Sequence, residues 1–383
     1  MLNFDLSPDQ EEFRQQVRRF AENEIKPKAI ELDEKEEFSV ELTQKMAELG
    51  LFAFLIPESY GGAESDYLSY VIAVEEIARV DGSHAATVAA ANSLGVGPIV
   101  YFGSDEQKQR WLPELATGES LAAFGLTEPN AGSDAGGSKT NAEWNGEEWV
   151  LNGSKIFITN GSSPMTKIVV VQAVTGVDEN GRKEYTCFLV PTDTPGFSAK
   201  TMHGKMMWRA SNTAELYFDD VKLPESAILG KRGDGFRQML YTLDKGRLSI
   251  GSMGLGGAQG AYEMALAYAK DRKQFGTPIS KFQAIGFKLA DMAVEIEAAR
   301  NLLYKACWLC DEKRSFKKEA AMAKLYCSEV MKRVVADAVQ IHGGYGLMKE
   351  YHVERFYRDQ KLLEIGEGTS EIQRLVISRM LGC

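Results

Sequence analysis

The stretch FQAIGFKLADMAVEIEAARNLL, residues 282–303, sets the character of the C-terminal part of the chain. Its apolar residues recur at alternating spacings of three and four, which places them on one face of a helix. The residues on this face are Phe282, Ile285, Leu289, Met292, Ile296, Ala299 and Leu303. A long helix with one apolar seam packs against other helices, so we predict a four-helix bundle over residues 233–383.

The N-terminal part is also predicted to be helical. Ser7, Pro8 and Gln10 form a capping-box pattern with proline in the first turn, which predicts a helix through about Ile25. Further helical patterns cover Val40–Leu49, Leu68–Val80 and Ala85–Val100, with a turn at Ile56–Gly62. We therefore predict an all-helical domain over residues 1–120.

Between these parts the pattern changes to short β-rich runs at residues 149–151, 168–171, 186–190 and 214–218. Three Asn-Gly dipeptides, at 145–146, 152–153 and 180–181, are typical of hairpin turns because both residues tolerate positive φ. We predict a small antiparallel barrel or sandwich over residues 121–232. The whole chain is thus expected to have an α+β fold that is mainly helical.

Charge and composition exclude some classes of protein. Lys plus Arg total 44 against 54 Asp plus Glu, and this net charge of −10 argues against nucleic acid as a partner. The chain starts without a basic segment followed by an apolar run, and no apolar run approaches the roughly 20 residues of a membrane span. We expect no membrane span and a cytoplasmic protein.

The five cysteines match no disulfide framework, and we expect reduced thiols. Cys307 and Cys310 have the C-x-x-C spacing of a redox or zinc half-site, but they fall in a strongly helical stretch without a second Cys/His pair. Packing in the core is the favoured interpretation, and no metal site is predicted.

Residues 124–137 read FGLTEPNAGSDAGG, a loop of small and hydroxylated residues that lets a ligand approach backbone donors. Alone it predicts only a flexible loop, since it lacks the lysine and the glycine spacing of nucleotide-binding loops. The glycines of Gly254–Gly260 lie in an apparent helix, where they favour close helix packing.

A second conspicuous segment begins at Gln340 and contains Gly343, Gly344 and Gly346. It continues to EIGEGTSEIQ, residues 364–373, in which Glu367 stands between two glycines. Local sequence alone favours a turn with a solvated acid, although a carboxylate between glycines is also sterically open to a reactant.

Together the two segments resemble the two signature motifs of the acyl-CoA dehydrogenase family, and the likeness extends over the whole chain. The resemblance implies the helical, β, helical fold, FAD as cofactor and an acyl-CoA substrate. It also implies transfer of electrons to an electron-transfer flavoprotein and a homotetramer. The second copy in each dimer would complete the FAD site.

The resemblance also implies roles for individual residues. The flavin ring would contact Phe124, Leu126, Thr127, Gly132, Ser133, Phe157, Ile158 and Thr159. The remaining cofactor contacts would come from Arg272, Gln274, Phe275, Gln283, Gln340, Gly343, Gly344, Thr369 and Glu371. The substrate would meet Ser133, Leu243, Asp244, Arg247, Gly366 and Gly368.

Glu367 matches the position of the catalytic base in short- and medium-chain members. The α-proton of a thioester is weakly acidic, so this carboxylate would act in a dry pocket while hydrogen bonds polarise the carbonyl. One donor implied by the resemblance is the backbone N–H of Glu367 itself. Desolvation is expected to raise the pKa of the carboxyl and make it a stronger base.

Three positions or segments are compared with relatives, and they bear on the base and on the substrate. Some relatives carry the base immediately before the arginine that is Arg247 here, but this position is Gly246, so Glu367 is the motif-matched candidate. The residue before the base is often tyrosine in straight-chain members and is Gly366 here, which should widen the pocket for a branched or cyclic acyl group; a short linear group stays the alternative, because other pocket residues could fill the space. No arginine lies between Arg79 and Arg110 to receive a distal carboxylate, so a dicarboxylyl substrate is not expected.

Two alternatives stay open. The first is an acyl-CoA oxidase of the same fold, which reacts with oxygen. The second is a non-catalytic relative that binds flavin or acyl-CoA, against which the intact Glu367 argues.

Overall fold

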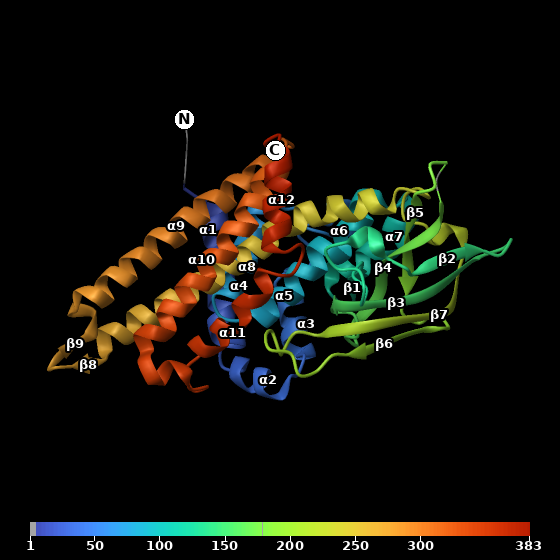
Figure 1. The fold of residues 1–383 in the computed structure, drawn as a ribbon. Coiled ribbons are helices and arrows are strands. Elements are labelled where there is room, and N and C mark those ends of the chain that lie inside the picture. The colour runs from blue at the N-terminus through green and yellow to red at the C-terminus, as the bar shows by residue number, and fades with distance from the viewer. Residues whose placement is uncertain (1–4, 178) are drawn as a thin grey trace.

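A computed structural model describes residues 5–177 and 179–383, and its element order is helical, then strand-rich, then helical (Figure 1). The mainly helical α+β fold predicted from the sequence is confirmed. Helix gives way to strand between Thr117 and Leu121, and strand to helix between Leu223 and Gly235. The domain boundaries 1–120, 121–232 and 233–383 stay a prediction.

The first part begins with the predicted capping box. Ser7 and Gln10 exchange two hydrogen bonds of 3.1 Å between side chain and backbone at the start of the first helix. The helices of this part are α1 (Pro8–Phe20), α2 (Ala29–Lys35), α3 (Val40–Glu48), α4 (Tyr67–Ala78), α5 (Gly82–Ala89), α6 (Gly97–Phe102) and α7 (Asp105–Thr117). A π-helical turn, Ala21–Ile25, extends α1 to the predicted end, and another, Ala90–Val96, joins α5 to α6.

The continuous helical stretch Gly82–Phe102 is long and apolar enough to cross a membrane by length and composition. This differs from the expectation that no such run exists. Gly, Ser and Asn interrupt the apolar residues, so the stretch does not read as one continuous apolar run. Of its most apolar window, 72% is buried inside the protein, where it packs on β1 (Leu121–Gly125) and on the first C-terminal helix. Burial of this kind is that of a core helix.

The middle part is one seven-stranded sheet in the order β1-β4-β2-β3-β7-β6, with β5 on β4. Besides β1, its strands are β2 (Asn141–Trp144), β3 (Trp149–Thr159), β4 (Thr166–Val177), β5 (Lys183–Pro191), β6 (Phe197–Thr201) and β7 (Thr213–Leu223). Purely antiparallel pairing was wrong: β1 pairs with β4 in parallel, as does one residue of β2. The long connection from Gly125 to Thr166 lets the chain return in the same direction.

Two of the three Asn-Gly pairs make the predicted hairpins, between β2 and β3 and between β4 and β5. The third was wrong, because Asn152-Gly153 lies inside β3. There Gly153 has φ 141° at a bulge opposite β7, and a Cβ would stand 2.6 Å from the hydroxyl of Thr140. Glycine is needed here for a close backbone approach within a strand.

The C-terminal part contains three long helices, α8 (Gly235–Asp271), α9 (Gln283–Asp311) and α10 (Lys317–His342), with the shorter α11 (Val353–Leu363) and α12 (Ser370–Met380) packed on α10. Five of the seven predicted seam residues of α9 are buried, from Leu289 to Leu303. The glycines of α8 permit close packing, as predicted: a Cβ at Gly254 would lie 2.9 Å from the carbonyl oxygen of Cys327 in α10.

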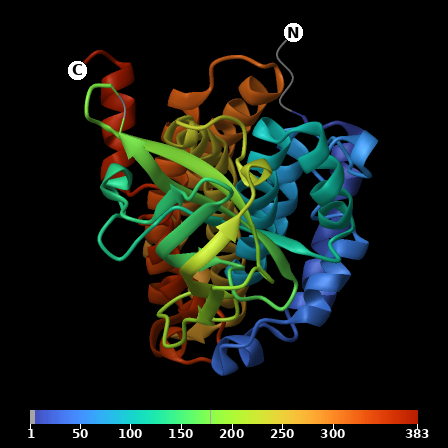
Figure 2. The ribbon, with the colours of Figure 1, turned by 90° about the vertical axis from the view of Figure 1, so that its right-hand side faces the viewer.

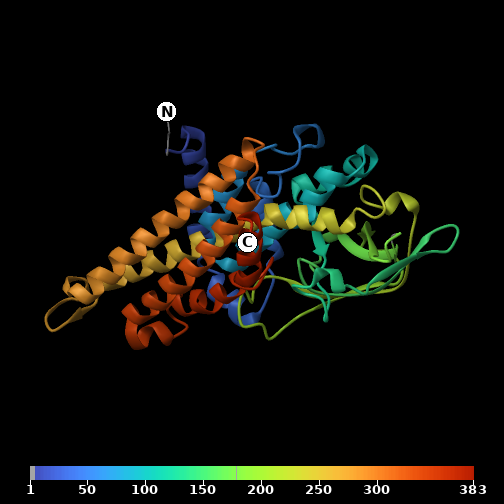
Figure 3. The same ribbon diagram turned by 45° about the horizontal axis from the view of Figure 1, so that its top comes forward.

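Helix α8 connects the two ends of the molecule. Its 37 residues run from the sheet, which faces the viewer in Figure 2, to the β8–β9 hairpin (Lys273–Gln274 and Thr277–Pro278) at the far end of the bundle. At 1.5 Å per residue the helix is about 55 Å long. Figure 3 shows the same helix passing from the bundle to the sheet.

Candidate active site

Glu367 lies in the turn between α11 and α12. It has φ 51° and the following Gly368 has φ 93°, so two consecutive residues adopt left-handed backbone conformations. The turn is held at its ends, because the N–H of Gly366 donates to the carbonyl of Leu362 at 2.7 Å and that of Ser370 to Glu364 at 2.9 Å. Thr369 caps α12, its hydroxyl accepting from the N–H of Ile372 at 3.2 Å.

The carboxylate of Glu367 points into the protein. Its Oε2 is buried and has no hydrogen-bond partner among the described residues. It stands against Gly246 of α8, where a Cβ would lie 2.2 Å from Oε2. Burial raises the pKa of Glu367 to about 7, although the cations Lys324 and Arg247 act in the opposite direction. Local sequence alone favoured a solvated acid, but Oε2 is shielded from solvent although the residue as a whole is half-buried.

Helix α8 presents the predicted substrate residues next to this carboxylate. Leu243 and Asp244 are half-buried and Arg247 is buried, one residue after Gly246. Arg247 pairs with Asp244, which also meets Lys317 of α10 at 3.3 Å. The structure thus brings Gly246 and Arg247 of α8 close to Glu367, with Leu243 and Asp244 about one turn away on the same helix.

The loop 124–137 is fixed by a buried ion pair that the sequence analysis missed. Lys155 of β3 is 1% exposed, and its Nζ lies 2.7 Å from Oε1 of Glu128 and 3.1 Å from the carbonyl of Leu126. The same carboxylate accepts the N–H groups of Lys139 and Thr140 at 2.7 and 3.0 Å. These bonds tie the loop to the sheet, so its shape is set before any ligand arrives.

The predicted flavin-facing residues lie on this loop and on β3. The N–H of Ile156 donates to the carbonyl of Thr127 at 2.9 Å, which places Thr127 beside the segment that carries Phe157 and Thr159. Phe157 is 63% exposed with φ 61°, at a bulge in β3. Phe124, Leu126 and Ile158 are buried, and Gly132 and Ser133 are exposed.

This surface fits a flavin. An exposed aromatic ring at a bulge offers an apolar face to a planar ligand. Among the described residues neither the Thr127 nor the Thr159 hydroxyl makes a hydrogen bond within the protein, so both are free for polar atoms of a ring. A Cβ at Gly132 would meet nothing within 4 Å, so the loop is open there.

The other predicted cofactor residues lie at the far end of the bundle. Arg272, Gln274, Phe275, Gln283, Gln340, Gly343 and Gly344 are all exposed there, around the β8–β9 hairpin and the end of α10. Arg247 and Arg272 are 25 residues apart on and just after α8, a rise of about 38 Å. One chain therefore does not bring the two groups of predicted FAD residues together. Ser133 and Glu371 are exposed, and within the described residues no hydrogen bond links Ser133 to α8.

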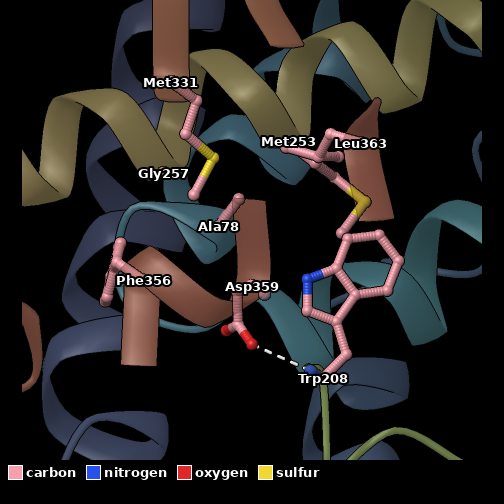
Figure 4. Close-up of a pocket in the computed structure, with 9 residues that line it drawn as sticks. Ala78, Trp208, Met253, Gly257, Met331, Phe356, Asp359 and Leu363 are labelled. Carbon is pink, nitrogen blue, oxygen red and sulfur yellow. Dashed lines mark hydrogen bonds between the residues drawn. The ribbon is translucent and has the colours of Figure 1, made fainter. Parts of the chain in front are cut away.

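A small cavity lies apart from the proposed flavin surface, beside the buried side of Trp208 (Figure 4). At about 10 Å³ it has room for one water at most, so it holds neither an acyl group nor a flavin. Asp359 accepts the N–H of Trp208 at 2.8 Å, and Arg355 pairs with Asp81 in the same region. Asp359 and Arg355, both in α11, thus connect this helix to the segment before β7 and to the start of α5.

Two histidines and the cysteines of the C-x-x-C pair are buried within the protein. His342 stacks on Tyr268 with 4.4 Å between ring centroids, and His84 contacts Asp81 at 2.6 Å. Cys307 and Cys310 are both buried in α9 as free thiols, which agrees with the packing interpretation.

Comparison with known proteins decides the family. Residues 7–119, 123–221 and 233–382 match the N-terminal, middle and C-terminal domains of acyl-CoA dehydrogenase. The chain belongs to the acyl-CoA dehydrogenase family. A probable acyl-CoA dehydrogenase of Bacillus subtilis is 54% identical over 380 residues, covering 99% of this chain and 100% of that protein.

Solved structures agree with this membership. Butyryl-CoA dehydrogenase from Megasphaera elsdenii has a TM-score of 0.96 and 43% identity, with full coverage of both chains. A chain of the structure described as electron transferring flavoprotein of Acidaminococcus fermentans has a TM-score of 0.95 and 43% identity, covering 99% of each chain. The expectation of an FAD-dependent oxidoreductase of this family is confirmed.

Proposed function

We propose that this acyl-CoA dehydrogenase converts an acyl-CoA thioester to the trans-2-enoyl-CoA, with Glu367 as the base that removes the α-proton. The observation that carries the proposal is the Oε2 atom of Glu367, which is buried against Gly246 without a hydrogen-bond partner in the described part of the chain. A buried, unpaired carboxylate is costly to folding, and a raised pKa in a closed site is typical of general bases.

The backbone around Glu367 supports the same role. Its N–H makes no hydrogen bond among the described residues, so it is free to donate to the thioester carbonyl. A donor at the carbonyl stabilises the charge that develops when the α-proton leaves. The left-handed conformation at 367 and 368 thus serves both the carboxylate and its own N–H group.

FAD, when bound, supplies the acceptor for the β-hydride, which no protein side chain provides. The residues that would hold the ring are Thr127, Phe157 and Thr159, with Thr369 at the N-terminus of α12 near Glu367. The exposed residues around Arg272 and Phe275 would hold the rest of FAD for a second copy of the chain. This arrangement supports an FAD-sharing dimer, and the homotetramer of two such dimers is what membership of the family implies.

The partners follow from the same family. We propose that electrons pass to an electron-transfer flavoprotein, in line with the relative found in the Acidaminococcus structure. We propose that the protein works in the cytoplasm, and its net charge of −10 argues against nucleic acid as a partner.

For the substrate we propose a short acyl group, with branched and alicyclic groups also accepted. Butyryl-CoA dehydrogenase is the structural neighbour that supports the short chain. Gly366 supports a wider pocket, because it carries no side chain although a Cβ there would clash with nothing: its nearest neighbours, atoms of Leu362, lie at 3.4 Å or more.

The test is anaerobic flavin bleaching by a panel of linear, branched and alicyclic acyl-CoA thioesters. We expect bleaching by butyryl-CoA and, at a comparable rate, by 2-methylbutyryl- or cyclohexanecarboxyl-CoA. Gly366→Tyr should selectively slow the two bulkier thioesters. Turnover of butyryl-CoA far above that of both bulky thioesters in the unmodified enzyme would contradict the wide pocket. Absence of bleaching by every thioester would contradict the function itself.

A further inference from the structure

The carbonyl oxygen of Gly368, next to the proposed base, receives two donors from inside the protein. Lys324 Nζ of α10 donates to it at 2.7 Å and Gln373 Nε2 of α12 at 2.9 Å. Lys324 and Gln373 are each 0% exposed. The turn that carries Glu367 is therefore held by hydrogen bonds from one cation and one neutral amide.

Lys324 reaches this position because α10 packs closely on α8. The backbone N of Lys324 would lie 3.6 Å from a Cβ at Gly251, and the glycine at 254 lets the next turn of α10 approach as well. The aliphatic part of Lys324 is thus buried in the helix bundle, and its ammonium group contacts the turn between α11 and α12.

This ammonium has no salt-bridge partner among the described residues. Burying a cation costs far more than burying an amide, and Gln373 already supplies a neutral donor to the same carbonyl. A purely structural clamp on Gly368 would not need a charge. The positive charge therefore points to a nearby negatively charged group with which it interacts.

Glu367 is the buried carboxylate that faces this charge. The Lys324 ammonium acts to lower the pKa of Glu367, against the effect of burial, and Glu367 in turn acts to raise the pKa of Lys324. We propose that Lys324 is a positioning residue for Glu367: it fixes the turn through the Gly368 carbonyl and keeps the carboxylate ionised in its water-poor site. The proposal rests on the proposed function only for the role of Glu367 as base.

Other groups also face this pair. Arg247 of α8 and Tyr70 of α4 interact with Glu367, whereas Glu364 and Glu371 interact with Lys324 from the two ends of the turn. Arg247 is already paired with Asp244, and burial lowers the pKa of Lys324 to about 8. Of the two cations near Glu367, Lys324 is therefore the one without a carboxylate within salt-bridge distance.

The test compares three variants of the holoenzyme. Lys324→Met removes donor and charge, Lys324→Gln keeps an amide donor without charge, and Gln373→Met removes the other donor but keeps the charge. Infrared difference titration follows the carboxyl band of Glu367, which Glu367→Gln identifies by its loss. Anaerobic flavin reduction by butyryl-CoA is measured over the same pH range.

We expect the titration midpoint of Glu367 to rise by about one pH unit or more in both Lys324 variants, a tenfold change in proton affinity. It should stay at the wild-type value in Gln373→Met. Flavin reduction in Lys324→Gln should fall about fivefold or more at pH 7 and recover as the pH is raised. Such recovery would not follow from mere loss of structure.

The proposal is overturned if the midpoint in Lys324→Gln equals that of the wild type, or if Gln373→Met shifts it equally. Should Lys324→Met fail to fold, Lys324→Gln still decides the matter. Absence of bleaching by any acyl-CoA would contradict the proposed function but leave the infrared titration able to confirm or refute the coupling.

Discussion

The side chain of Glu367 packs directly against the backbone of Gly246 in α8. A Cβ on residue 246 would stand 2.2 Å from Oε2 and 3.2 Å from Cδ of Glu367. The carboxylate uses the space that a side chain on α8 would fill. A side chain at 246 and a base in the observed position at 367 are therefore mutually exclusive. This relationship explains why the helix has glycine at a position where glycine is unfavourable.

Gly246→Ala tests this relationship. The added methyl group should displace the carboxylate, and we expect flavin reduction by butyryl-CoA to slow by about 100-fold, since misplacement by roughly 1 Å can cost that much. FAD content should be retained. The control is Gly286→Ala in α9, where a Cβ would have its nearest neighbour at 3.8 Å and activity should not change. Wild-type rates in Gly246→Ala would contradict the observed packing.

The pH dependence follows from the raised pKa of Glu367, about 7, which burial causes. A base works only when ionised, so flavin reduction at limiting butyryl-CoA, which reports the substrate-free enzyme, should rise about tenfold from pH 6 to pH 8 and then level off. Stopped-flow measurement across this range gives the midpoint. A profile that is flat from pH 5 to pH 8 would exclude a base with this pKa.

The same shift affects stability with a defined sign. The folded pKa of Glu367 lies above its usual 4.5, so its favourable contribution is complete below about pH 4.5 and is lost as the pH rises through 7. Glu367→Gln lacks this loss. Its free energy of unfolding, compared with the wild type, should be higher at pH 8 than at pH 5 by on the order of 1 to 3 kcal/mol. Equal differences at the two pH values in denaturant titrations would refute this.

Lys155→Met tests the ion pair behind the flavin loop. Glu128 would be left as a buried, unpaired carboxylate, so we expect a loss of about 3 to 5 kcal/mol in unfolding free energy and weaker retention of FAD. The double variant Glu128→Met with Lys155→Met should recover much of the stability, because no buried charge remains. A single variant as stable as the wild type would show that the pair does not hold the loop.

Phe275→Ser tests the contribution of a second copy to the cofactor site. Phe275 is 96% exposed at the far end of the bundle and remote from Glu367. If a partner subunit buries it against FAD, the variant should bind FAD at least about tenfold more weakly, as loss of a buried aromatic side chain implies. Val177→Ser, also exposed but at the sheet end, is the matched control. Unchanged FAD affinity and assembly state in Phe275→Ser would argue against the shared site.

Local patterns in the sequence were sufficient for most helices. The Ser7–Gln10 capping box and the apolar seam of α9 are set by residues close together in the chain, and both are confirmed. The parallel pairing of β1 with β4 could not be predicted, because it depends on a connection of some forty residues whose path no local pattern describes. Asn152-Gly153 was mispredicted because its glycine accommodates the close approach of Thr140, which lies 13 residues earlier, next to the pairing of Asn141 with Asn152.

The site shows the same division. Glu367 was identified from its motif, yet its burial depends on Gly246, about 120 residues earlier in the chain. Lys324 was not singled out, because a lysine in a helix ordinarily indicates a solvated face. Only the close packing of α8 and α10 and the position of the turn at Gly368 make it a buried cation.

Glu367→Gln gives the most direct test of the central claim. The amide keeps the size of the side chain but cannot accept the α-proton. The variant should bind FAD as the wild type does, while anaerobic bleaching by butyryl-CoA slows by about two orders of magnitude or more. Undiminished bleaching in this variant, with FAD fully bound, would contradict the assignment of Glu367 as the base.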